Sequence, residues 1–217
     1  MTACSSAPYR LLLCAALLML SGLARAADTC GWQSVVLPGN RPALSPNPAA
    51  LLERPPMPPD PTMDAELRQA SQQGAEQAQA LLQAARSPMP IGQIGGAWRV
   101  DCIQVGANTA FAYPFFAARI EPDACGFHFN KTTGSQRRSG QPYRDARGDR
   151  SLVLLGTLTV NDAAPRAYAQ GLLTGSAVVD VDHPANHAGR LFRLGSRERL
   201  LILDANAAGY ELYGLRC

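Results

Sequence analysis

One short segment of the chain has side chains that could bind an anion. They are Ser135, Gln136, Arg137 and Arg138. Two guanidinium groups, a hydroxyl and the backbone amides of a turn at Gly134 can together hold a carboxylate or a phosphate. In the alternative, the glycine sets the turn and the arginines are solvated or paired with Glu121 or Asp123, because turn residues usually serve the turn. If one loop of this protein is functional, we expect it to be this one.

A second segment could supply metal ligands. Within eight residues it has two carboxylates and two imidazoles, those of Asp180, Asp182, His183 and His187. Pro184 interrupts regular geometry there, and Asp, His, Pro and Asn commonly build turns between strands. We therefore expect a turn and no cofactor, with a metal site as the alternative.

The sequence lacks the motifs of several common enzyme classes. It has no G-x-S-x-G elbow, no H-E-x-x-H helix and no P-loop. The third histidine, His128, alternates with two phenylalanines and is expected to point to solvent. Pairs of carboxylates can converge without a sequence signature, so a hydrolase stays an alternative. We expect a protein without catalytic residues.

The first 26 residues are typical of a secretory signal peptide. Residues 1–10 are polar with one positive charge, 11–20 are apolar, and small residues lead to Ala26. The apolar run is about ten residues long, whereas a helix that crosses a bilayer needs about twenty. We expect cleavage after Ala26 and a periplasmic or secreted protein without a membrane span.

Removal of this leader leaves four cysteines, Cys30, Cys102, Cys125 and Cys217. An even number in an exported chain predicts two disulfides, with three possible connectivities. We favour Cys102–Cys125, which closes a loop of about 22 residues, and Cys30–Cys217, which joins the two ends. Zinc is disfavoured because the cysteines are scattered singly along the chain.

The charge of the chain argues against polyanionic partners. Arg10 and Arg25 leave with the leader, which lowers the formal net charge from +3 to +1. A nearly neutral protein has no electrostatic basis for binding nucleic acid or an anionic membrane. We expect a monomer whose partner is a small ligand or an envelope protein.

The remaining chain divides into three parts. Residues 27–61 contain nine prolines, which predicts an extended segment with few backbone hydrogen bonds. Residues 62–90 are rich in Ala, Gln, Glu and Leu and predict a helix with a narrow stripe of small residues, followed by a linker. From 91 to 217, short β-branched and aromatic runs alternate with turn residues.

These runs predict eight or nine antiparallel strands in a sandwich or a barrel, of which we favour the barrel. The expected strands are 97–105, 110–120, 125–131, 151–161, 167–173, 176–181, 190–194, 199–204 and 210–216.

Gly95-Gly96-Ala97-Trp98 heads the first expected strand. A G-x-W opening resembles the start of lipocalins and related calycin barrels, in which the tryptophan packs at the closed end. The resemblance implies that Trp98 lies at the barrel base, where Arg216 of the last strand could cover its ring. A tryptophan that opens any buried strand would look the same, so ordinary core packing stays an alternative.

A longer resemblance rests on six short stretches in order. They are AWR at 97–99, YPFF at 113–116, KTTGSQRRSG at 131–140, LLG at 154–156, VND at 160–162 and PRAY at 165–168. Together they resemble an uncharacterised family of exported bacterial proteins, domain of unknown function 4893, over about residues 62–217. The resemblance implies a layout and export, and it carries no catalytic residues.

We therefore expect a non-catalytic binding module of the cell envelope. It would use either the barrel mouth for a small apolar ligand or the arginine-bearing loop for an envelope partner. A periplasmic protease inhibitor and a metal- or carboxylate-dependent hydrolase are the alternatives.

Overall fold

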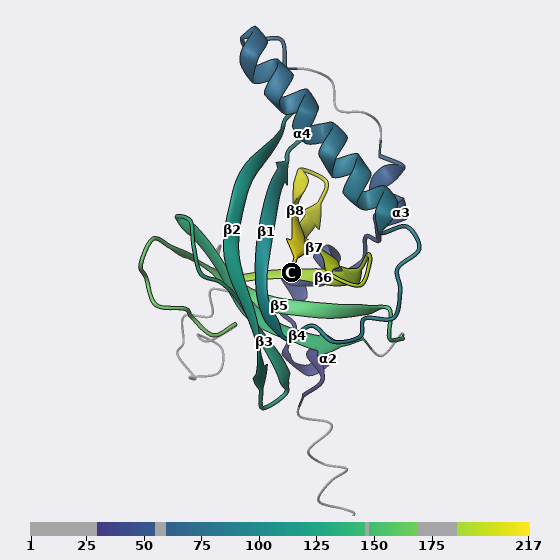
Figure 1. Ribbon diagram of the computed structural model, residues 1–217, viewed down its shortest axis with the longest axis vertical. Helices are drawn as coiled ribbons and strands as arrows, with labels where there is room; N and C mark the ends of the chain where they lie inside the picture. The colour runs from purple at the N-terminus through teal and green to yellow at the C-terminus, as the bar shows by residue number, and fades with distance from the viewer. Residues whose placement is uncertain (1–29, 55–59, 146–147, 169–185) are drawn as a thin grey trace, which may run out of the picture.

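The computed structural model describes residues 30–54, 60–145, 148–168 and 186–217 (Figure 1). In this part of the chain eight antiparallel strands form a closed barrel, in which each strand pairs with the next and the last closes on the first. They are β1 (Gly96–Val105), β2 (Ala110–Asp123), β3 (Gly126–Lys131), β4 (Gln136–Arg144), β5 (Ser151–Val160), β6 (Asn186–Arg193), β7 (Glu198–Asn206) and β8 (Gly209–Arg216). The predicted barrel is confirmed.

Alternation along the strands separates the interior of the barrel from its outer surface. In β1, Trp98, Val100 and Cys102 belong to the interior cluster, whereas Ile103 belongs to a cluster beneath a helix. The Trp98 indole donates to the carbonyl oxygen of Ile94 over 2.9 Å. One end of the barrel is therefore filled by apolar side chains, and Trp98 is buried among them.

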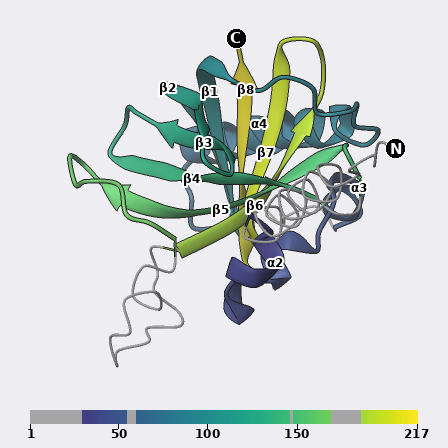
Figure 2. The same cartoon turned by 90° about the horizontal axis from the view of Figure 1, so that it is seen from below.

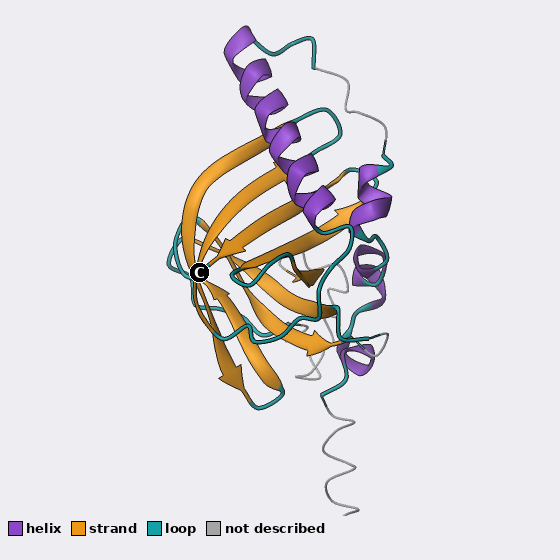
Figure 3. Ribbon diagram, turned by 45° about the vertical axis from the view of Figure 1, so that its right-hand side comes forward, coloured by secondary structure: helices purple, strands orange, loops and turns teal. Residues whose placement is uncertain are grey.

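The predicted helix is α4 (Ala65–Ala84), which lies across the outside of the barrel (Figure 3). Asp64 caps it by accepting from the Leu67 amide. The small residues allow close docking, since a Cβ on Gly74 would lie 2.2 Å from the carbonyl oxygen of Ala110. A second core forms beneath this helix. It comprises Leu51, Ala78, Leu82, Ala85, Ile103, Phe192, Leu200, Ile202, Ala205 and Leu212.

The prediction of an extended proline-rich segment is wrong for residues 30–54, here called the N-terminal strap. They form α2 (Trp32–Val35), η1 (Pro38–Asn40), η2 (Pro42–Leu44) and α3 (Pro48–Leu52). Proline favours the first helical position, where its missing N–H is not needed, and three of these four turns begin with one. The strap covers the outer face of β5 and β6, where Val36 and Leu44 pack with Val153 and other buried residues (Figure 2).

Strand β4 was not predicted from the sequence, because Gly140 and Pro142 weaken the strand pattern. The glycine has a structural reason here. A Cβ on Gly140 would lie 2.5 Å from the carbonyl oxygen of Leu155 in β5. Residues 167–168 of one expected strand are not in a strand, and 169–185, with the rest of two expected strands, lie outside the described residues.

Both predicted disulfides are wrong, because Cys30 is bonded to Cys125. Cys102 is a buried thiol and Cys217 an exposed one. Gly96 pairs with Ile120, so the β2–β3 turn that carries Cys125 lies at the start of β1. Cys102 is six positions further along β1, or about 20 Å at about 3.3 Å per residue. Cys125 therefore reaches the strap rather than the barrel interior.

Among the helices in the described residues, none combines the length and the apolarity that crossing a bilayer requires.

Candidate functional site

A charged side chain of β4 lies inside the barrel. The Arg138 side chain is 8% exposed. Its Nε and Nη2 donate to the two carboxylate oxygens of Glu211 in β8, over 3.2 and 2.6 Å. Two-point pairing is the strongest geometry between an arginine and a carboxylate. Burial lowers the pKa of Arg138, but Glu211 and Tyr213 more than offset this effect, so the guanidinium stays charged.

His187 of β6 completes the environment of this guanidinium. Arg138 Nη1 lies 2.8 Å from His187 Nδ1. Because an arginine only donates, Nδ1 must accept, and the proton of the neutral ring is on Nε2. Burial and the nearby Arg138 hold the pKa of His187 well below its usual value. A hydrogen bond with the Ser139 backbone acts in the opposite direction and raises the pKa of His187, but burial and Arg138 outweigh it. The Nε2 atom is buried and has no hydrogen-bond partner of good geometry.

Asp204 of β7 brings a second carboxylate to Arg138. One of its oxygens lies 3.7 Å from Arg138 Nη1, and the other accepts from the amide of Ala188 over 3.2 Å. Burial raises the pKa of the Asp204 carboxyl to about 6, against the opposing effect of Arg138. The side chain is 35% exposed, so part of the carboxylate stays hydrated.

Lys131 of β3 lies next to this group. Its Nζ donates to the carbonyl oxygens of Thr133 and Gln136 over 3.0 and 2.6 Å, and it stands 3.8 Å from the centre of the Phe116 ring. Burial lowers the pKa of the ammonium. Burial also raises the pKa of the Cys102 thiol to about 12, so this cysteine is not a thiolate nucleophile.

Three exposed or half-buried side chains form the rim above the buried charges. The Gln104 amide donates to Gln136 and to Glu211, both over 3.3 Å, and accepts from the Tyr113 hydroxyl over 3.3 Å. Gln104 stands on β1 at the end opposite the apolar base formed by Trp98. We call this end the barrel mouth. The mouth therefore presents amide and phenol groups to solvent, with an ion pair beneath them.

The four residues predicted to form an anion-binding loop do not share one surface. Gln136 and Arg138 take part in the mouth, whereas Arg137 pairs with the exposed Asp162 over 3.0 Å, and Ser135 is exposed. Neighbours in a strand point to opposite faces, and β4 begins at Gln136. The arginines therefore find Asp162 and Glu211 as partners rather than Glu121 or Asp123.

The predicted metal candidates separate in a similar way. His187 lies in the barrel with Nδ1 bonded to Arg138, and Asp180, Asp182 and His183 lie outside the described residues. Within the described ranges no group of three or more His, Cys, Asp or Glu side chains could hold a metal ion.

The cation near Trp98 is Arg199, whose guanidinium carbon lies 5.5 Å from the ring centre. The predicted Arg216 pairs instead with Asp101 and Glu198 and is 61% exposed. Its register explains the difference. Arg216 is opposite Arg99 of β1, which faces outward, so its side chain also points away from the barrel interior. Arg199 is opposite Leu215 of β8, which faces inward, so its side chain points toward Trp98.

Sequence reasoning missed Glu211, Asp204, Lys131 and Gln104. The signal for Glu211 is its alternation with Tyr213 and Leu215, which places a carboxylate on the inward face of β8. Lys131 similarly alternates with Phe129.

The fold and the site together define a closed eight-stranded barrel with an apolar base and a charged, hydrogen-bonded mouth. The chain belongs to the family described as Domain of unknown function (DUF4893), whose model matches residues 52–206. Comparison with curated proteins and with solved structures returned no match.

Proposed function

We propose that this protein is a non-catalytic binding module that holds a small polar ligand at the barrel mouth. The observation that carries the proposal is the Arg138–Glu211 pair buried beneath Gln104 and Gln136. Taking an ion pair out of water costs on the order of several kcal/mol, and apolar side chains of similar volume often stabilise a fold as well as a buried ion pair does, or better. A buried pair is therefore weak evidence for a purely stabilising role. Ionisable groups with perturbed pKa values gather at functional sites.

The lining of the mouth favours a polar ligand over the apolar one expected from the sequence. The amides of Gln104 and Gln136 and the hydroxyl of Tyr113 both donate and accept hydrogen bonds. A molecule that itself both donates and accepts, such as a sugar or a small amide, matches this set.

The chemistry of the cluster supports binding rather than catalysis. The raised pKa of Cys102 keeps its thiol protonated. His187 is neutral, and its Nδ1 already accepts from Arg138. A general base needs a free nitrogen within reach of the substrate, which His187 does not offer while this contact holds.

The disulfide supports the proposal that the protein is exported. Disulfides persist in oxidising compartments such as the periplasm, and Cys30–Cys125 is such a bond. A leader that is removed after Ala26 would place Cys30 near the new N-terminus. We propose that the protein works in the periplasm or is secreted.

Native mass spectrometry of the protein purified from a bacterial periplasm tests the binding proposal. We expect a mass excess that disappears on denaturation. The fraction of the protein that carries this excess should be lower in Gln104→Ala, which removes a rim amide. It should be unchanged in Arg137→Ala, which removes a charge beside the site but outside the barrel. A bare native mass, combined with no thermal shift across a panel of sugars and small amides, contradicts the proposal.

A further inference from the structure

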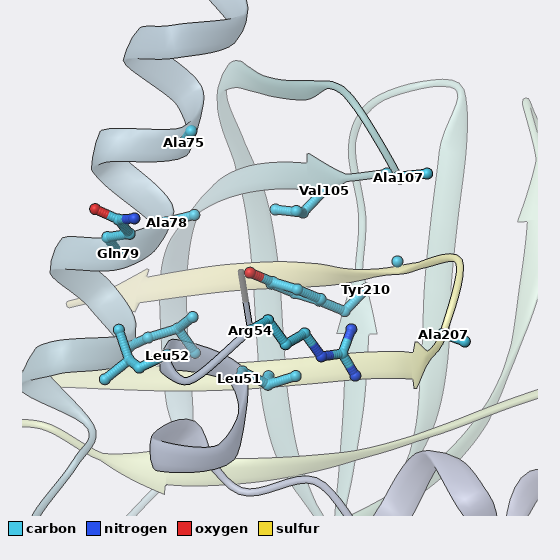
Figure 4. Close-up of a pocket in the computed structure, with 13 residues that line it drawn as sticks. Leu51, Leu52, Arg54, Ala75, Ala78, Gln79, Val105, Ala107, Ala207 and Tyr210 are labelled. Atoms are coloured by element: carbon cyan, nitrogen blue, oxygen red, sulfur yellow. The ribbon is translucent and has the colours of Figure 1, made fainter. Parts of the chain in front are cut away.

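A pocket lies outside the barrel, between α4, the strap and two strand turns (Figure 4). Its volume is about 380 Å³, within the range of small-molecule sites. Leu51 and Leu52 of α3 line one side, Ala75 and Ala78 of α4 another, and Val105 of β1 lies on the barrel wall. The walls are mostly apolar, and none of the described residues that line them is acidic.

The pocket exists because α4 presents short side chains to a barrel that it cannot approach more closely. Gly74 already lies against the backbone of Ala110, and the Ser71 hydroxyl accepts from the Ala110 amide over 2.9 Å. On the other side of the pocket, Leu82 is packed in the core beneath the helix. These contacts lie on both sides of Ala75 and Ala78 along the helix. They fix the distance between α4 and the barrel, which keeps the space open.

One cation lines this apolar space. The Arg54 guanidinium carbon lies 5.5 Å from the centre of the Tyr210 ring, and Nη1 donates to the carbonyl oxygen of Asn206 over 2.9 Å. Both side chains lie between α4 and the turns that carry Ala107 and Ala207 (Figure 4). Within the described residues Arg54 forms no ion pair with a carboxylate. Its other N–H groups are donors for an anion.

We propose that this pocket binds an amphipathic carboxylate, such as a medium-chain fatty acid. The aliphatic chain would lie against Ala75, Ala78 and Leu82, and the carboxylate would bind Arg54. An apolar wall with a single fixed cation matches a ligand that has one anionic head and an apolar body. This site differs from the barrel mouth in position and in ligand chemistry, and it does not depend on the function proposed for the mouth.

Titration calorimetry with decanoate and with decanol, both below the concentrations at which they aggregate, tests the proposal. We expect decanoate to bind and Arg54→Gln to weaken it by about tenfold, the effect of one charge-assisted hydrogen bond. Decanol, which lacks the charge, should bind more weakly than decanoate and should not respond to Arg54→Gln.

Two variants, each of which replaces one alanine of α4 by leucine, distinguish binding in the pocket from adsorption to the surface. Ala75 lines the pocket and is half-buried, so Ala75→Leu should fill the space and abolish the binding of both probes. Ala70 is exposed and does not line the pocket, so Ala70→Leu should leave binding unchanged. Decanoate binding that survives Ala75→Leu, or no binding to the wild-type protein, overturns the inference. Gln104→Ala should not affect decanoate, so failure at the mouth and failure here are distinguishable.

Discussion

Asp204 combines a left-handed backbone with a carboxyl whose pKa is raised. Its φ is 51°, and burial raises its pKa from 3.8 to about 6. The folded state therefore holds this proton more tightly than the unfolded state does. The free energy of unfolding should fall as the pH rises from about 4 to about 6, because ionising the carboxyl costs more in the folded protein.

Asp204→Asn removes this titration and keeps a residue that tolerates the left-handed conformation. Relative to wild type, the variant should gain about 1 kcal/mol of stability between pH 4 and pH 7. The gain is less than the full shift implies, because the exposed part of the side chain stays hydrated. Urea unfolding at several pH values measures the difference. Parallel stability profiles for the two proteins would refute the raised pKa.

The composition of the site could be predicted from the sequence only in part. Gln136 and Arg138 belong to the predicted anion-binding loop, and His187 belongs to a different segment, predicted as a turn with a metal site as the alternative. Their convergence depends on strand register, which pairs β8 with β1 and places Glu211 within reach of Arg138. A shift of one position in β4 would turn Arg138 outward and Arg137 inward. No local pattern decides between these two arrangements.

Helix α4 offers a substitution whose effect should be opposite in sign to the usual one. Replacing a glycine inside a helix by alanine normally stabilises it by about 1 kcal/mol. At Gly74 the added Cβ would lie 2.2 Å from the backbone oxygen of Ala110. Gly74→Ala should instead destabilise the protein by about 1–3 kcal/mol, because the helix must move away from β2.

Urea unfolding of Gly74→Ala, with Gln73→Ala at the adjacent exposed position as a control, measures this effect. The control should differ from wild type by less than about 0.5 kcal/mol. A Gly74→Ala protein that is more stable than wild type would mean that the helix does not dock as closely as described.

The elements differ in how well the sequence predicts them. Residues 62–90 predict a helix with a stripe of small residues, and α4 forms there. Only part of that stripe docks, since Gly74 and Ala78 are buried whereas Leu67 and Ala70 are exposed. The prolines of residues 27–61 predict an extended segment, because a proline inside a helix breaks it. Proline breaks a helix in its interior but favours its first turn, and composition alone does not show which position each proline takes.

The disulfide joins two parts of the molecule that are distant in sequence, since Cys30 and Cys125 are 95 residues apart. In the chain-entropy model a loop of this length stabilises the folded state by about 4–5 kcal/mol. Cys30→Ser should lower the free energy of unfolding by about 2–5 kcal/mol, and Cys217→Ser, at an exposed thiol, should have little effect. Guanidinium unfolding without reductant measures both. Equal stability of Cys30→Ser and wild type would contradict the bond.

The barrel class was predictable because short strands with close turns and few helices leave few other architectures. The pairing of the cysteines was not, because it depends on which end of the barrel the β2–β3 turn occupies and on where the strap crosses the surface. Both are properties of the assembled molecule rather than of the cysteine spacing.

The Cys30–Cys125 bond also limits how far the chain can lengthen under tension. It closes a covalent ring that contains the strap, α4, β1 and β2. A force applied between residue 30 and Cys217 passes through the sulfur atoms and bypasses this ring. At about 3.5 Å per extended residue, the sequence separation of 95 between the bonded cysteines corresponds to roughly 330 Å of contour length. That length is available to a reduced molecule and hidden in an oxidised one, so the oxidised protein should extend less under tension than the reduced protein does.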